Sequence, residues 1–175
     1  MRNVKQRGFT LIELMIVVAI LSILLFVAIP NFSDFVADGR VQSAKSKLIS
    51  SISFARTEAI KRGASVALCR TTNGTSCAAN GVDWSDGWLI YDVDSGNILR
   101  VQTEIDDAIS ITYSTTSRII YDGRGFLITG VGGDTTFIIG DASSADSEEG
   151  LFVRSTGRVR SCADWDAGAH VCNDN

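Results

Sequence analysis

Histidine is nearly absent from this 175-residue chain, in which His170 is the only one. A Ser-His-Asp triad, a Cys-His pair or a histidine-based metal site would depend on that single side chain, which lies in a polar tail. The adjacent acids Asp106-Asp107 and Glu148-Glu149 look like solvated loop charge. We therefore predict no enzyme, no metal site and no cofactor.

Positive charge is in the minority, with 16 Lys and Arg against 20 Asp and Glu and a formal net charge of −4. Three of the cations, Arg2, Lys5 and Arg7, precede residue 9, so the rest of the chain carries about −7 on its side chains. Such an acidic body does not coat nucleic acid with a general basic surface. Any contact with a polyanion has to use a local patch.

Closely spaced cysteines are also missing, because the four cysteines follow C-x7-C and C-x9-C spacings and not those of zinc or redox motifs. Three disulfide pairings are possible, and an exported domain in an oxidising compartment favours disulfides. We favour the local pairs Cys69–Cys77 and Cys162–Cys172, since each would close one irregular loop. Metal binding or free thiols are the alternative.

One feature that the chain does have is a long apolar run. From Phe9 to Ile29 only Thr10, Glu13 and Ser22 are not apolar. A helix of this length spans roughly 30 Å, about one bilayer core. The basic residues before the run predict a leader in the cytoplasm and a body on the other side of the membrane. A cleaved secretory signal has a shorter apolar core and a small-residue cut site, and an ordinary single-pass anchor has no reason to keep Glu13.

The segment Gly-Phe-Thr-Leu-Ile-Glu-Leu, Gly8 to Leu14, resembles the processing signature of type IV pilins and of the pseudopilins of type II secretion. The resemblance implies a leader, residues 1–8, that a prepilin peptidase removes after Gly8, followed by methylation of Phe9. It also implies that Glu13 pairs with the N-terminal amine of a neighbouring subunit. The protein would cross the inner membrane once with its head in the periplasm, and would then enter an extracellular pilus fibre.

Proline occurs once, at Pro30, and an amphipathic pattern continues beyond it. Apolar residues recur at steps of three or four, which is typical of one helical face: Val41, Ala44, Leu48, Ile52, Ala55 and Ala59. We predict one long helix over residues 9–62, with the membrane or filament core at 9–29. Pro30 should kink or loosen this helix, and Gly63 should end it.

The remainder, residues 63–175, is predicted to be a β-rich head with a flexible C-terminal tail. Short β-like runs alternate with Gly, Asp, Ser and Asn, which indicates an antiparallel sheet and an α+β fold. The expected strands are Ala64–Arg70, Gly87–Asp92, Ile98–Thr103, Ile109–Tyr113, Arg118–Tyr121, Thr135–Ile139, Leu151–Ser155 and Arg158–Ser161. The acidic segment Gly140–Gly150 is expected to be a mobile loop.

Four segments of this body resemble the FimT/GspH-type minor pilins and pseudopilins. They are SFARTEAIKRG (53–63), the Trp84–Trp88 region, IIYDGRGF (119–126) and STGRVRSC (155–162). The resemblance implies a β-sandwich-like head of two antiparallel sheets with the helix packed along one of them.

An arginine cluster stands near the C-terminus, at Gly157-Arg158-Val159-Arg160. In an extended strand Arg158 and Arg160 lie on one face, and Arg154 precedes them. Their guanidiniums could bind successive phosphates, with Gly157 allowing a close backbone approach. The alternative is a turn of solvated arginines paired with Glu148 or Asp164.

The residues Gly157, Arg158 and Arg160 also match a Gly-Arg-x-Arg motif that contacts DNA in some FimT-type minor pilins of natural transformation. The resemblance therefore implies a minor pilin that binds double-stranded DNA for uptake. The alternatives are a structural or priming minor pilin, or a type II secretion pseudopilin, neither binding DNA. The implied partners are other major and minor pilins, the prepilin peptidase, the inner-membrane assembly machinery, and membrane lipid before assembly.

Overall fold

The computed structural model describes residues 9–79, 81, 83–103, 105–113, 118–128, 135–162, 165–166, 168–169 and 171–172. Side chains of residues 25–32, 145–146 and 171 are not among those described. The predicted leader with Gly8, the acid Asp164 and the histidine His170 lie outside the described residues.

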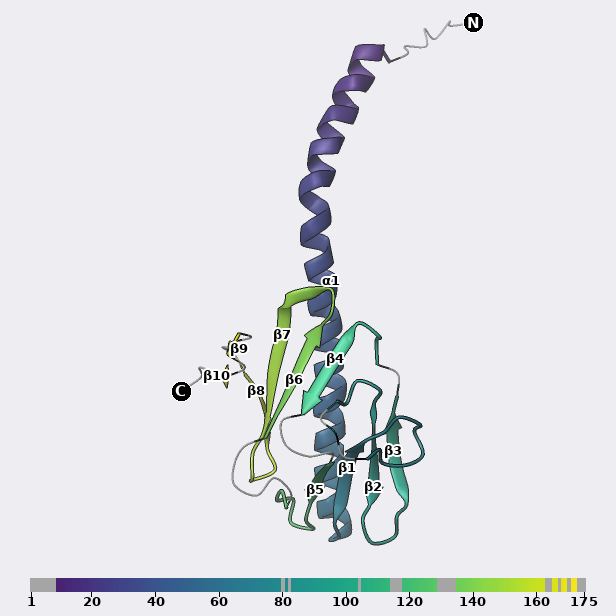
Figure 1. Cartoon of the computed structure of the whole chain (residues 1–175), viewed down its shortest axis with the longest axis vertical. Helices are drawn as coiled ribbons and strands as arrows, with labels where there is room; N and C mark the ends of the chain where they lie inside the picture. Colours follow the sequence, from purple (N-terminus) through teal and green to yellow (C-terminus); the bar gives the residue numbers. More distant parts are fainter. Residues whose placement is uncertain are drawn as a thin grey trace, which may run out of the picture.

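One helix, α1 (Leu11–Arg62), runs the length of the molecule, unbroken at Pro30 and with a gentle curve (Figure 1). It begins two residues later than expected because Thr10 is its N-cap and forms a capping box with Glu13. It ends at Gly63, which adopts the left-handed conformation of a C-cap (φ 62°). Judged on the side chains that the structure describes, no helix is both long and apolar enough to cross a membrane. The span over residues 9–29 stays a prediction.

The described side chains divide α1 into an exposed and a buried half. From Phe9 to Leu24 the large apolar side chains are exposed, whereas the described core begins at Ala37. The amphipathic face predicted from the sequence is buried throughout: Val41, Ala44, Leu48, Ile52, Ala55 and Ala59. Because a fragment that starts at Ser33 retains every buried residue described, we expect this head to fold by itself.

Two antiparallel four-stranded sheets pack on this buried half (Figure 1). The first has the order β3-β2-β1-β5, with bounds β1 (Val66–Arg70), β2 (Trp88–Asp92), β3 (Ile98–Gln102) and β5 (Arg118–Tyr121). The second has the order β4-β6-β7-β8, with bounds β4 (Ile109–Tyr113), β6 (Thr135–Asp141), β7 (Ser144–Val153) and β8 (Val159–Ser161). The helix contacts strands of both sheets, and not of one alone.

The segment Gly140–Gly150 is not the mobile loop that its composition predicts. It forms most of the β6–β7 hairpin, whose turn is held by Asp141 as its carboxylate accepts hydrogen bonds from the backbone N and the Oγ of Ser143. These two hydrogen bonds and the guanidinium of Arg40, 3.5 Å away, hold the pKa of Asp141 below its usual range. The acid is thus a turn-forming residue.

Two polar residues of β7 attach the strand to the helix. Ser147 Oγ donates to Asp38 Oδ1 over 2.7 Å. Glu149 forms an ion pair with Lys45 and accepts a hydrogen bond from Gln42 Nε2 over 2.5 Å. The acidic and hydroxyl side chains of this segment therefore find partners on α1, which is why a polar sequence forms a strand here.

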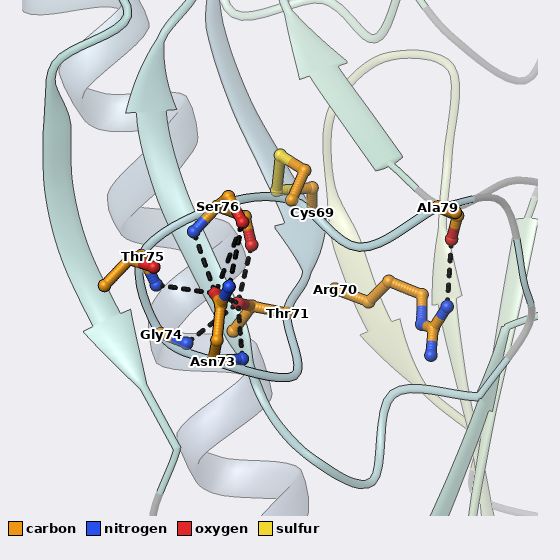
Figure 2. Close-up of a disulfide and its surroundings, with 9 residues drawn as sticks. Cys69, Arg70, Thr71, Asn73, Gly74, Thr75, Ser76 and Ala79 are labelled. Atoms are coloured by element: carbon orange, nitrogen blue, oxygen red, sulfur yellow. Dashed lines mark hydrogen bonds between the residues drawn. A yellow bond between two sulfur atoms is a disulfide. The ribbon is translucent and has the colours of Figure 1, made fainter.

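The first disulfide, Cys69–Cys77, closes the loop after β1 (Figure 2). Inside that loop Asn73 Oδ1 accepts hydrogen bonds from the backbone N of Thr75 and of Ser76, at 2.9 and 3.0 Å. The Asn side chain thereby shapes a compact turn.

The second disulfide, Cys162–Cys172, joins the end of β8 to the tail. The tail was expected to be flexible, yet its described residues form a small two-stranded sheet, β9 (Trp165–Asp166) and β10 (Val171–Cys172). Both disulfides are the local pairs that the spacing favours.

Candidate nucleic-acid interface

The predicted arginine cluster lies at the tip of the β7–β8 hairpin. Arg154 N donates to Arg158 O over 2.9 Å, and Gly157 N donates to Arg154 O over 2.7 Å. Gly157 has φ 79°, the left-handed conformation typical of the last residue of a three-residue hairpin loop. The loop therefore sets Arg154 and Arg158 opposite each other as its first and closing residues.

Gly157 has a different role from the one expected. It is buried, and a Cβ on it would lie 2.1 Å from the carbonyl O of Gly125. The glycine lets the hairpin approach the β5–β6 loop, and its backbone is not open to a phosphate. A close approach was predicted, but the structure places protein and not ligand against this residue.

All three arginines are exposed on the outer face of the second sheet. The register pairs Val153 with Val159, which face the core, and Phe152 with Arg160, which face outward. An open groove of about 450 Å³ follows this edge, lined by Arg154, Thr156, Arg158, Val159 and Arg160. Since β8 is the last strand of its sheet, the groove lies along an edge that a long ligand can reach.

The helix holds this hairpin through Arg56. Its Nε donates to Gly125 O over 3.0 Å and its Nη2 donates to Thr156 O over 3.1 Å. Tyr121 Oη adds a longer hydrogen bond of 3.5 Å to Gly157 O, and burial raises the pKa of this phenol so that it keeps its proton. Three of the four family-like segments, far apart in the sequence, therefore meet at the base of the hairpin.

Sequence reasoning placed Arg56 on a solvated face of the helix and did not assign it to the site. The signal that could have found it is its membership of one of the segments that carry the family resemblance. Those segments meet in space because an arginine with several donors can join two loops by their carbonyl oxygens.

The acids proposed as possible partners of the arginines are only partly described. Glu148 accepts a hydrogen bond from Trp165 Nε1 over 2.9 Å, and Asp164 lies outside the described residues. On the neighbouring loop Arg124 forms an ion pair with Asp122 at 3.1 Å. The cluster is thus a local basic site on an acidic protein, as the charge balance requires.

At the other end of the chain, Phe9 is 86% exposed and Glu13 caps its own helix with Thr10. The processing and assembly roles of Gly8, Phe9 and Glu13 remain predictions. The structure shows that Glu13 also has a local role, because it binds the backbone N of Thr10.

Comparison with known proteins agrees with this arrangement. The family described as "Type II transport protein GspH" matches residues 44–165, and the family described as "Prokaryotic N-terminal methylation motif" matches residues 3–29. The type IV minor pilin FimU of Pseudomonas aeruginosa has a similar fold, with a TM-score of 0.58 and 20% identity over 70% of this chain and 88% of that one.

Curated relatives match mainly the N-terminal part. The type IV major pilin protein PilA of Myxococcus xanthus is 59% identical over 46 residues, which is 26% of this chain and 21% of that protein. A fimbrial protein of Pseudomonas aeruginosa is 44% identical over 70 residues, 40% of this chain and 45% of that protein. The chain thus spans less than half the length of these relatives. Because the GspH match covers most of the chain, the chain belongs to the GspH family and is a type IV minor pilin or pseudopilin.

Proposed function

We propose that this protein is a minor type IV pilin that holds extracellular double-stranded DNA through the β7–β8 hairpin for uptake in natural transformation. The observation that carries the proposal is the groove at a sheet edge where Arg154, Arg158 and Arg160 are all exposed. The structure supports a site of this kind by its geometry, and the DNA itself is the proposed ligand.

The spacing of the arginines suits a phosphate backbone. Arg158 and Arg160 are two residues apart on one strand, about 6.7 Å along it. Arg154 faces Arg158 across the hairpin, so the three guanidiniums form a short triangle of positive charge. Each can bind a phosphate with two parallel N–H donors. Such contacts do not read the bases, and binding is therefore independent of sequence and sensitive to salt.

The rigid base of the hairpin supports this role. Arg56 and Tyr121 hold the turn from beneath, so the arginines project from a fixed backbone and lose less entropy when a phosphate binds. Because the rest of the protein is acidic, DNA is confined to this tip and the filament stays uncoated.

Insertion and assembly would use the other end. The methylation motif over residues 3–29 supports a leader that a prepilin peptidase removes after Gly8, and methylation of Phe9. Residues 9–29 would sit in membrane lipid of the inner membrane, with the head in the periplasm. They would then pack among other pilins in the fibre, with Glu13 pairing a neighbour's terminal amine, once the inner-membrane machinery has extracted them.

The test uses the head from Ser33 onward and a short fluorescent duplex, with binding measured by anisotropy over a salt series. We expect Arg158→Gln with Arg160→Gln to weaken binding by at least about tenfold at low salt and to lower the salt slope by about 1.8. The matched control is Arg100→Gln with Arg118→Gln, which removes the same charge from the first sheet and should change binding little. Equal losses in both double variants would reduce the effect to net charge and contradict the site.

A second function, a secretion pseudopilin that acts only through protein contacts, is favoured by the match to a type II transport family. It predicts that deletion in the source bacterium stops protein export and leaves DNA uptake intact. The DNA-receptor proposal predicts the opposite pair of results.

A further inference from the structure

Two aromatic rings continue the outer face on which the arginines lie. Phe152 is directly opposite Arg160 in the register of β7 and β8. The ring of Phe152 meets the ring of Trp165 edge to face, with centroids 6.3 Å apart and planes at 62°. Both side chains are half-buried, so part of each ring is exposed beside the guanidinium of Arg160.

The position of Trp165 is set by three contacts. Its ring lies against Gly150, where a Cβ would come within 2.3 Å of the ring atom Cε3. Its Nε1 donates to Glu148 Oε1 over 2.9 Å. The Cys162–Cys172 disulfide ties the strand pair that carries the ring to the end of β8. A ring held in this way needs no reordering when a planar ligand stacks on it.

Going along the hairpin from its tip, the outer face therefore changes in a fixed order. Arg154 and Arg158 come first, then Arg160 with Phe152, then Trp165 over Gly150, and finally Glu148. Positive charge thus gives way to aromatic surface and then to a carboxylate. The order suits a ligand with anionic groups at one side and flat apolar faces at the other.

We propose that Phe152 and Trp165 make this a site for single-stranded DNA, in which unpaired bases stack on the rings while the arginines hold the phosphates. The inference rests on the proposed function and deepens it. Every base has a stacking face, so the contact is independent of sequence, as arginine–phosphate contacts are. Glu148 repels phosphate at the far side of Trp165, so the sugar–phosphate backbone stays over the arginines and only the base reaches the rings.

The same geometry makes duplex DNA the weaker ligand. Bases inside a duplex are covered by their neighbours in the stack, so they offer a flat face to the rings only at a strand end or after unpairing. A duplex therefore gains the arginine contacts alone. Single strands gain the arginine contacts and one or two stacking contacts.

The experiment compares a short single strand with a duplex of the same sequence on the head from Ser33 onward, at one salt concentration. We expect the single strand to bind about five- to tenfold more tightly. Phe152→Leu and Trp165→Leu should each reduce this preference and leave duplex binding unchanged. Trp165→Phe keeps a ring and should retain the preference.

Tryptophan fluorescence supplies a second readout if Trp165→Leu disturbs the tail. Trp84 and Trp88 are fully buried, so quenching by a bound strand reports on Trp165, and Trp165→Phe should abolish it. Equal affinity for both forms of DNA, with no quenching, would overturn the aromatic site and leave the arginine site standing. Binding of neither form would overturn the proposed function itself.

Discussion

The guanidinium of Arg56, on the helix, donates a hydrogen bond to the carbonyl O of Thr156, in the turn of the arginine hairpin, over 3.1 Å. Its Nε donates to Gly125 O at the same time. One side chain therefore joins the element that would enter the filament to the loop that would hold DNA. The tip of the hairpin has its orientation set by the helix and not by its own sheet alone.

Replacing Arg56 by Ala should loosen the hairpin without removing an arginine from the groove. Two carbonyl groups lose a charged donor, and we expect a loss of about 1–3 kcal/mol in the free energy of unfolding of the head. Arg56→Lys should recover little, because an ammonium group cannot reproduce the two-armed donor geometry. Urea titration measures the stability, and anisotropy measures the accompanying loss of DNA affinity. Unchanged values in both would show that Arg56 does not position the hairpin.

Gly157→Ala should destabilise the head more than a glycine substitution at an open left-handed position. Gly157 combines φ 79° with a Cβ position 2.1 Å from Gly125 O, whereas Gly96 has φ 73° and nothing within 4 Å. Gly96→Ala therefore measures the backbone cost, about 1 kcal/mol, and the excess in Gly157→Ala measures the clash. We expect that excess to be at least another 1 kcal/mol or so. Equal losses at both positions would contradict the close approach of the two loops.

The two disulfides should differ in what their removal affects. Cys69 is buried in β1, so Cys69→Ala with Cys77→Ala should lower the melting temperature of the whole head, by an amount equivalent to about 2–3 kcal/mol. Cys162→Ala with Cys172→Ala should leave the main core nearly as stable and release Trp165, which acrylamide quenching would detect as greater exposure. A tail that stays in place after this change would show that Glu148 and Gly150 hold it without the disulfide.

Acid should weaken the β6–β7 hairpin through Asp141. Hydrogen bonds from Ser143 and the charge of Arg40 lower the folded-state pKa of Asp141 below the ordinary value of 3.8. A lowered pKa stabilises the fold at pH values above the unfolded-state pKa, and this contribution is lost as pH falls below about 4 and through the folded pKa. Asp141→Asn should therefore reduce stability at neutral pH and flatten the acid dependence. Parallel stability curves for both proteins would rule Asp141 out as the titrating group.

Strong local signals in the sequence predict the fold well. The buried helical face from Val41 to Ala59, the stop at Gly63 and the strand Ile109–Tyr113 follow from periodicity and turn residues, and the structure confirms them. Gly140–Gly150 was wrongly predicted, because its acids are paired with residues about a hundred positions earlier in the chain. Composition alone does not show partners so distant.

The candidate site could be predicted only in part for the same reason. Alternation along a strand is enough to place Arg158 and Arg160 on one face. The contributions of Arg56 and Trp165 depend on loop contacts and on a disulfide that bring distant segments together. The tight packing at Gly157 likewise appears only once the β5–β6 loop is in place.

An NMR titration of the head with a short DNA duplex tests the central claim most directly. We predict chemical-shift changes concentrated on Arg154, Gly157–Ser161 and the neighbouring loop, which disappear when Arg158 and Arg160 are both replaced by Gln. Shifts of the same size spread over the acidic surface, or no shifts at low salt, would contradict a DNA site at this hairpin.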